Sequence, residues 1–349
     1  MSSKFLYNLK GIGRMLAPNF LLNLEREIAK IWEFDSASLE SIQERVRYYC
    51  KLSAPFNLQD FALSPPPSLD SSFKENPPFK IESPKISLLK DAYKGRYFSA
   101  YYYDGYEFSR YFARGLLIGC AFGDVNYYLQ QPAITKSRPI ADFGDISQNS
   151  VLFKLDKDRH FAFVKDSVPF ESKRDILFFR GAAYQQHRIK FLEKFFHAPF
   201  CDVAHTGKKE ALPQFYKPKV SKEAHLPYKF LLSLEGNDVA SNLKWILNSN
   251  SLCLSPKMKL ETWFMEGKLE AGVHYACISD EYEDVEETME YYKANPARAK
   301  EIIQNAHEFC AQFFNPKIER ALALLVLRKY FYLSGQIEIS AQEKAFFGC

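Results

Sequence analysis

The feature that most constrains this chain is a regular alternation of short apolar runs and amphipathic segments between residues 175 and 314. Such alternation is typical of βαβ units, in which parallel strands are joined by helices that cover the sheet. The apolar runs predict buried strands at residues 175–181, 201–205, 228–236, 251–255 and 274–280. Helical patterns lie at residues 185–196, 239–250, 285–295 and 296–314. We therefore predict an α/β fold whose ligands bind at the carboxyl ends of the strands.

The rest of the chain is organised differently. Helical patterns run through much of residues 1–52, and six prolines among many serines at 63–87 predict an extended strap. Further elements are predicted as strands at 113–125, 150–155 and 161–164 and as a final helix at 317–333. We expect three parts, namely a helical arm with the strap at 1–87, a first α/β domain at 88–167 to which residues 315–349 return, and a second α/β domain at 168–314.

Composition excludes several classes of protein. The 46 Lys and Arg residues against 42 Asp and Glu leave a net charge of +4, too small to indicate a nucleic-acid binder. Seven cysteines without a CxxC pair predict reduced cytoplasmic thiols rather than disulfides or a zinc cluster. No apolar run approaches the roughly 20 residues that cross a bilayer, and residues 1–20 lack the apolar core of a secretory signal.

Two stretches carry an unusual balance of charge. Residues 154–222 have a net charge of +7, which suits an anionic ligand such as a diphosphate, although solvated faces explain most of the lysines equally well. Residues 1–22 contain Lys4, Lys10 and Arg14 among apolar side chains and no acidic residue. This pattern fits a basic amphipathic helix at a membrane surface, while a helix packed on the body of the protein is the alternative that we favour.

The first of three candidate sites is FFRGAAYQQHR at 178–188, where a strand ends at Arg180, Gly181 allows a tight turn and a helix is expected to begin over Ala182–Ala183. The free N–H groups of a helix N-terminus bind phosphate, and Arg180 and Arg188 would add bidentate contacts. The alternative is an ordinary strand-to-helix turn with two surface arginines.

The second candidate, SLEGNDVASNLKW at 233–245, repeats this arrangement. We expect Asp238 to cap the helix or to bind a hydroxyl group, because its carboxylate would repel a phosphate. The Glu235 carboxylate also suits hydroxyl groups, unless it is an ordinary surface carboxylate, whereas Ser241 and Asn242 are the better phosphate donors. The candidate residues of this loop are, in order, Glu235, Gly236, Asn237, Asp238, Ser241 and Asn242.

The third candidate lies in AFGDVNYYLQQPAITKSRPI at 121–140, where Asp124 follows a buried strand. A carboxylate in that position can accept a proton from an attacking hydroxyl group. Lys136 and Arg138 follow within reach of the same edge of the sheet. A simple Gly-Asp turn is the alternative for Asp124.

Other patterns carry no function in this interpretation. Asp156-Lys157-Asp158 has the form of a DxD metal-binding pattern, but its position between two predicted strands favours a hairpin loop. The seven histidines form no HxxxH or HxH pair, so no metal site is predicted. The chain also lacks GxGxxG, GxxxxGK[ST] and GxSxG, which leaves dinucleotide, P-loop and hydrolase functions without support.

Six segments carry a resemblance to a known family, namely YYYDGYEFSRYF (101–112), FGDVNYYLQQPAITKSRPI (122–140), RHFAFVKD (159–166), ILFFRG (176–181), YKFLLSLEGNDVASNLKWILNSNSLCL (228–254) and ETWFMEGKLEAGVHY (261–275). In this order they resemble the lipopolysaccharide-modifying glycosyltransferases, a family that also contains fungal capsule-associated proteins and animal protein O-glucosyltransferases. The resemblance covers residues 88–333 and points to a bacterial branch.

The resemblance implies a GT-B fold, in which two Rossmann-like domains face each other across a cleft, here with a helical N-terminal extension. Residues 88–167 would form the acceptor side and 168–314 the nucleotide-sugar donor domain. The implied reaction is an inverting, metal-independent transfer of glucose or a related hexose or pentose from a UDP-sugar, without a cofactor, to a hydroxyl of lipopolysaccharide or lipooligosaccharide core. Such an enzyme would be cytoplasmic, with peripheral contact at the inner membrane left open.

The resemblance also assigns residues. Asp124 matches the family's catalytic aspartate, Arg180 and Gly181 match its arginine-glycine motif at the donor diphosphate, and 236–242 match the loop beside the donor. Some relatives carry an arginine at or near Asn242, and its absence here leaves Lys244, Arg188 and Lys136 as candidate replacements. Contacts with the acceptor or with phosphate are expected from Lys136, Arg138, Tyr102 and Asp104. The rings of Tyr101–Tyr103 and Tyr127–Tyr128 would stack on acceptor sugars or, equally well, pack inside the protein.

Two other functions stay open at this point. One is a non-catalytic nucleotide-sugar or glycan-binding module of the envelope, which would bind a UDP-sugar without releasing UDP. The other is a peripheral membrane scaffold that acts through residues 1–22. The sequence names neither the sugar nor the acceptor, the linkage or the oligomeric state.

Overall fold

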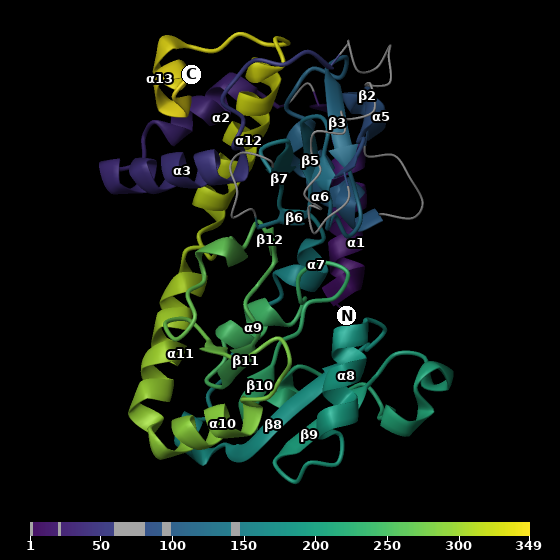
Figure 1. Cartoon of the computed structure of the whole chain (residues 1–349). Coiled ribbons are helices and arrows are strands. Elements are labelled where there is room, and N and C mark those ends of the chain that lie inside the picture. Colours follow the sequence, from purple (N-terminus) through teal and green to yellow (C-terminus); the bar gives the residue numbers. More distant parts are fainter. Residues whose placement is uncertain (1–2, 20–21, 59–80, 93–98, 141–146) are drawn as a thin grey trace, which may run out of the picture. The chain divides into compact units, whose positions relative to one another are not determined.

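The computed structural model describes residues 3–19, 22–58, 81–92, 99–140 and 147–349, which belong to two compact units (Figure 1). The first unit comprises Met1–Asp158, Leu260–Trp263 and Asn315–Cys349. The second unit comprises Arg159–Lys259 and Phe264–Phe314. The C-terminal part of the chain therefore belongs with the N-terminal part, and the second unit is an insertion between them.

The second unit is built on a five-stranded sheet in which all strands are parallel. Its strands are β8 (Arg174–Gly181), β9 (Cys201–His205), β10 (Tyr228–Leu232), β11 (Leu252–Ser255) and β13 (Ala276–Cys277). The order in the sheet is β13-β11-β10-β8-β9, so the chain first moves outward to β9 and then returns past β8 to the other side. This is the doubly wound order 2-1-3-4-5, whose direction reverses between β8 and β10. The predicted parallel α/β fold is confirmed for this unit.

One face of this sheet forms a continuous apolar core with helices. Leu177 and Phe179 of β8 and Phe230 of β10 share a buried cluster with side chains of α8 (Gln186–Phe195), α10 (Val285–Ala294) and α11 (Pro296–Ala311). Because side chains alternate along a strand, Phe178 lies on the other face, where it stacks on Tyr228 with ring centroids 4.0 Å apart. Phe178 is 3% exposed and its ring also lies 4.8 Å from the ring of His225, so the sheet is shielded on this face at Phe178 as well.

Residues 161–164, which the sequence predicts as a strand, do not form one. The carbonyl groups of Ala162 and Val164 accept hydrogen bonds from the side chains of Lys222 (2.6 Å) and Asn248 (2.8 Å) rather than from a neighbouring strand. The preceding DxD is not a hairpin loop either, since the short helix α7 (Lys157–His160) begins within it. The prediction was wrong because a short run of apolar residues suits aromatic contacts in a loop as well as it suits a strand.

The first unit contains a four-stranded sheet of order β2-β3-β5-β7. The inner strands β3 (Leu117–Ala121) and β5 (Ala133–Thr135) are parallel to each other and to β7 (Ser150–Leu152), while the edge strand β2 (Lys85–Leu88) is antiparallel to β3. Two further strand pairs are β1 (Ile81–Glu82) with β4 (Tyr128–Leu129) and β6 (Ser137–Pro139) with β12 (Leu260–Thr262).

The predicted strap at residues 63–87 lies partly within the described residues. Its last residues form β1 and β2, so this part is paired into sheets rather than running over the surface as a separate segment. Residues 63–80 of the strap lie outside the described residues. Proline excludes strands only where the backbone N–H is needed, so the residues that follow the prolines are free to pair.

The helices of the first unit come from both ends of the chain. The predicted arm contributes α1 (Ser3–Leu16), α2 (Leu24–Ile31) and α3 (Ser36–Tyr49), and further helices are α5 (Leu89–Ala92), α6 (Ser99–Ser109), α12 (Pro316–Leu333) and α13 (Ala341–Phe347). The yellow helix α12 lies beside α2 and α3 and is buried over nearly its whole length (Figure 1). Among the described residues, no helix has the length and apolar character needed to span a membrane.

Glu319 of α12 joins four segments of the first unit. Its carboxylate accepts hydrogen bonds from Arg45 of α3 at 2.5 Å, from Lys154 at 2.7 Å and from Nε1 of Trp263 at 2.8 Å. The Trp263 ring in turn stacks on Tyr49 with centroids 3.8 Å apart. The Glu319 charge is therefore compensated by two cations that burial has largely removed from water, and losing it would leave both without a counter-ion.

Replacing Glu319 with Gln should lower the free energy of unfolding of the first unit by about 3–5 kcal/mol, because two buried cations lose their counter-charge. Urea unfolding followed by Trp fluorescence measures this loss, since Trp263 belongs to the cluster. The control Glu301→Gln removes a carboxylate whose side chain is 57% exposed on α11 and should change stability by about 0.5 kcal/mol or less. Equal unfolding midpoints for Glu319→Gln and the parent would contradict this role.

Candidate active site

The second unit brings two of the three predicted sites together at the carboxyl edge of its sheet. The loop after β8 contains residues 182–185, because α8 begins at Gln186 and not over Ala182–Ala183 as predicted, and the loop after β10 contains residues 233–242. The two loops are neighbours because β8 pairs directly with β10. The strand order reverses between these two strands, and in doubly wound sheets this is where the loops separate and ligands bind.

Arg188 of α8 ties the two loops to each other. Its guanidinium donates to the carbonyl of Ala182 in one loop at 2.7 Å and to those of Leu234 and Glu235 in the other at 2.6 and 2.8 Å. Burial lowers the pKa of Arg188 to about 10, so the group keeps its charge at neutral pH. The predicted site residue Arg188 is thus a cation at the junction of both loops.

Gly236 allows this close approach of Arg188. A Cβ atom at Gly236 would lie 3.3 Å from a terminal nitrogen of Arg188, tighter than most such contacts. Beside it, Asn237 is exposed and its side chain accepts a hydrogen bond from Gln185 of the other loop at 2.9 Å. The two loops are therefore joined by side-chain bonds as well as by their strands.

The remaining residues of the loop after β10 play different parts. Ser241 is exposed at the end of the loop, whereas Asp238 is buried. The Glu235 carboxylate accepts a hydrogen bond from the Lys259 backbone N–H at 3.0 Å. Asn242 donates to the carbonyl of Leu232 at 3.0 Å, so its amide shapes the loop.

The helix after this loop is shorter than predicted. Helix α9 (Leu243–Leu247) begins at Leu243 rather than at residue 239. Asp238 is therefore not its N-cap, a position that Asn242 occupies. Residues 239–242 fit a helical sequence pattern, but the bonds of Asn242 to the end of β10 hold them in a turn.

Arg180 and Gly181 end β8, as the sequence predicts. The Arg180 side chain is 8% exposed and donates to the Asp202 carboxylate and carbonyl, both at 2.8 Å. Its guanidinium also lies 4.3 Å from the centroid of the Phe178 ring. In this arrangement Arg180 connects β8 to β9. Gly181 lies against the Phe179 ring, and a Cβ atom added at Gly181 would come within 2.4 Å of that ring.

The third predicted site forms in the first unit. Lys136 Nζ donates to the Asp124 carboxylate at 2.8 Å. The Lys136 side chain is 1% exposed, while that of Asp124 is 36% exposed. The two residues meet because they follow β3 and β5, which are adjacent parallel strands with carboxyl ends at one edge. A half-exposed carboxylate held by a buried ammonium is suited to act as a base at the surface of a site.

The loop that carries Asp124 is fixed at both sides. Ser137 Oγ accepts from the Val125 N–H at 3.1 Å and donates to the Val125 carbonyl at 3.0 Å. Gly123 has a φ of 104°, a left-handed conformation that favours glycine. Tyr101 donates to the Gly123 carbonyl at 3.3 Å, and its ring lies 5.9 Å from Lys136 Nζ.

Three other residues predicted to contact the acceptor or a phosphate interact with side chains or backbone of the protein itself. Arg138 is 0% exposed and forms an ion pair with Glu261 at 2.7 Å, and Asp104 is 0% exposed and accepts from the Lys157 N–H at 2.8 Å. Their burial favours structural roles over ligand contact. Tyr102 is half-buried and stacks on Tyr106 with centroids 5.6 Å apart.

Sequence reasoning missed three polar residues at the loops after β8 and β10. His187 lies 2.8 Å from the Glu235 carbonyl, and Gln185 contacts Asn237. Buried His205 accepts from the Ala183 N–H through Nδ1 at 3.0 Å and so holds the turn after β8. The adjacent Gln-Gln-His run was the available signal for the first two, because it follows a strand end within the predicted phosphate turn.

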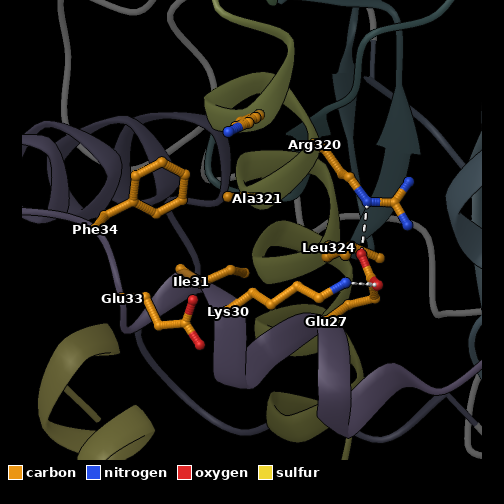
Figure 2. A pocket seen from close by; sticks show the side chains of 9 residues that line it. Glu27, Lys30, Ile31, Glu33, Phe34, Arg320, Ala321 and Leu324 are labelled. Atoms are coloured by element: carbon orange, nitrogen blue, oxygen red, sulfur yellow. Dashed lines mark hydrogen bonds and ion pairs between the residues drawn. The ribbon is translucent and has the colours of Figure 1, made fainter.

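A separate hollow of about 500 Å³ lies between α2 and α12 in the first unit (Figure 2). Ile31, Phe34 and Leu324 contribute apolar side chains to it. At one side Glu27 accepts from Lys30 and from Arg320, both at 2.8 Å, so its charge is compensated within the lining. None of the predicted site residues lines this hollow.

Comparison with known proteins identifies the class. Residues 155–333, which include the whole second unit and α12, match the family described as Glycosyl transferase family 90. The O-glucosyltransferase LpsA of Dichelobacter nodosus is 40% identical over 308 residues, which cover 87% of this chain and 88% of that protein. The O-glucosyltransferase rumi of Drosophila melanogaster is 24% identical over 187 residues, which cover 51% of this chain and 45% of that protein.

The family match and these relatives, with which the α/β fold is compatible, define a glycosyltransferase. The chain belongs to glycosyl transferase family 90. The family resemblance drawn from the sequence motifs is thereby confirmed. The stretch that matches the family begins after Asp124 and Lys136, so the first-unit pair is supported by its geometry and not by that match.

Replacing Arg188 with Met should release the two loops, because three carbonyl groups lose their shared donor. The Glu235 carbonyl keeps its contact with His187, but an acceptor left without a partner costs about 1–3 kcal/mol when it is buried, so the loss at Ala182 and Leu234 should lower local protection. Hydrogen exchange measured by mass spectrometry should show faster exchange in residues 182–185 and 233–242. Lys190→Met on the same helix, where the side chain is 49% exposed, should leave that exchange unchanged. Equal protection in both variants would count against the bridging role.

Proposed function

We propose that this protein is an inverting glycosyltransferase of the GT-B class that moves glucose, or a related hexose or pentose, from a UDP-sugar to a hydroxyl of lipopolysaccharide or lipooligosaccharide core. The observation that carries the proposal is the pair of loops at the strand-order reversal of the second unit, which the half-buried Arg188 cation joins. O-glucosyl transfer by the relatives supports a glucose donor and a hydroxyl acceptor. The lipopolysaccharide acceptor and the GT-B class rest on the motif resemblance.

Asp124 is the proposed catalytic base. The acceptor oxygen attacks the anomeric carbon, the bond from that carbon to the diphosphate breaks, and the acceptor proton passes to the Asp124 carboxylate. Lys136 orients that carboxylate through the 2.8 Å ion pair. A single displacement of this kind inverts the configuration at the anomeric carbon. A positioned base contributes about 10²–10⁴-fold to the rate.

The diphosphate of the donor is proposed to bind at the loops after β8 and β10 in the second unit. Among the three candidate replacements for the arginine of some relatives, Lys244 is buried in an ion pair with Glu266 at 2.6 Å and Lys136 is paired with Asp124. Arg188 is the candidate that lies between the two loops. Its charge would stabilise the negative charge that develops on the leaving diphosphate. Exposed Asn237 and Ser241 are the proposed partners of the donor's polar groups.

The place of action follows from the proposed substrates. A UDP-sugar is available in the cytoplasm, and a growing lipopolysaccharide core is anchored in the inner membrane. We therefore propose a cytoplasmic enzyme that meets its acceptor at the membrane surface, with no nucleic acid as partner.

The decisive experiment measures UDP release from a panel of UDP-sugars with purified core oligosaccharide as acceptor. One donor should give acceptor-dependent release, and Asp124→Asn should lower its rate by about 10²–10⁴-fold while circular dichroism stays unchanged. The matched control Asp175→Asn removes a carboxylate that is 53% exposed in the second unit and should keep the parent rate.

Two results would overturn this proposal. Binding of a UDP-sugar without release of UDP for any acceptor would identify a non-catalytic binding module instead. Near-parental transfer by a folded Asp124→Asn variant would remove the base assignment.

Metal removal gives a separate test of the reaction type. Arginine and helix or loop N–H groups, rather than a divalent ion, are proposed to hold the diphosphate. EDTA should therefore leave the transfer rate within about twofold of its untreated value, whereas metal-dependent transferases lose their bridging ion. A loss that added Mg²⁺ or Mn²⁺ restores would contradict the metal-independent mechanism.

A further inference from the structure

Helix α1 is attached to the first unit through one of its faces. Tyr7 donates to the Ala100 carbonyl of α6 at 3.0 Å, and Arg14 forms an ion pair with Glu107 at 2.7 Å. Gly11 lies against the Tyr103 ring so closely that a Cβ atom would come within 2.4 Å of it. Residues 7, 11 and 14 recur at helical spacing, so one side of α1 is committed to α6.

The opposite side of α1 carries an exposed apolar stripe. Phe5, Leu9, Ile12 and Leu16 also recur at helical spacing, half a turn away from the attached side. Their exposed fractions are 51%, 55%, 45% and 79%. A surface helix normally turns such a stripe toward a core, but here the side facing the protein is taken by other residues. A contiguous exposed patch of large apolar side chains marks a binding surface.

The charges on α1 indicate which kind of surface it meets. Residues 3–16 include basic residues and no acidic one; Lys10 is exposed, whereas Arg14 is paired with Glu107. Two copies of the protein that met through this face would bring like charges together, which is unfavourable. An apolar face rich in Phe and Leu on a helix with basic and no acidic residues is typical of helices that lie in the interface of anionic membranes.

We propose that α1 docks this protein on the surface of an anionic lipid bilayer. The helix lies parallel to the membrane, with the Phe5, Leu9, Ile12 and Leu16 stripe at the acyl boundary and Lys10 among the anionic headgroups. The inference goes beyond the proposed function and does not rest on it, because it follows from the exposure, spacing and charge of α1 alone. It supplies the element by which an enzyme with a lipid-anchored acceptor reaches its substrate.

The test is co-sedimentation of the full chain with vesicles of phosphatidylethanolamine and phosphatidylglycerol, compared with vesicles of phosphatidylcholine. The parent should bind the anionic vesicles and should be released at a salt concentration that shortens the Debye length to about 3 Å. Leu9→Glu and Ile12→Glu should each lower the partition coefficient by about tenfold or more, since each removes an inserted apolar side chain. Lys10→Glu should weaken binding to the anionic vesicles only.

The control Tyr291→Glu places the same charge on α10 of the second unit, where the side chain is 52% exposed, and should bind like the parent. A Phe5→Trp variant gives a second readout, because brominated lipids should quench its added fluorescence even if a charged variant perturbs the fold. Three results would each overturn the proposal: absence of parent binding, equal binding by Leu9→Glu, or a parent dimer that Leu9→Glu dissociates without any lipid binding. The vesicles hold no glycan or nucleotide sugar, so a failure to bind them would not contradict the proposed transferase activity. Conversely, absence of UDP release in the transfer assay would not contradict binding of the vesicles by α1.

Discussion

The parallel pairing of β8 with β10 is the constraint on which the second-unit site depends. Parallel strands run in the same direction, with a crossover that returns the chain to the starting edge each time. Every strand of this sheet therefore ends at the same edge. Because β9 lies on one side of β8 and β10 on the other, the chain leaves those two neighbouring strand ends in opposite directions. Arg188 lies where the two loops meet and bonds to carbonyls from both. The cation is therefore positioned by the topology and not by its neighbours in sequence.

The ion pairs of the predicted site residues differ in whether the carboxylate is buried or exposed. Arg138 with Glu261 and Lys244 with Glu266 are fully enclosed, and their charges serve the arrangement of strands and helices around them. The Asp124 carboxylate is different because its partner Lys136 is enclosed while it is itself partly exposed. A charged group can act on a substrate only where solvent and substrate reach it. The same sheet edge thus supplies a buried cation for support and an accessible carboxylate for chemistry.

Much of the candidate site could be predicted because it depends on short stretches of chain. The strand that ends at Arg180 and Gly181 and the Asp124 that follows β3 were readable from apolar runs that end in turn residues. The errors lie where longer-range contacts override local pattern. Residues 161–164 have the composition of a strand, but side chains from elsewhere take their carbonyl groups. Helix α9 begins late because Asn242 bonds back to the end of β10.

The sequence by itself determined the α/β class of the second unit, the ends of its strands and the residue types that follow them, because hydrophobic periodicity and turn residues act over a few positions. Only the tertiary structure decided which of those residues are accessible. Asp104 and Asp124 are both aspartates near tyrosines in the sequence, yet one is enclosed with Lys157 and the other is partly exposed beside Lys136. Likewise the apolar pattern of α1 could suit a buried or an exposed face, and its contacts with α6 select the exposed one. Burial depends on which distant segments meet, and no local pattern contains that information.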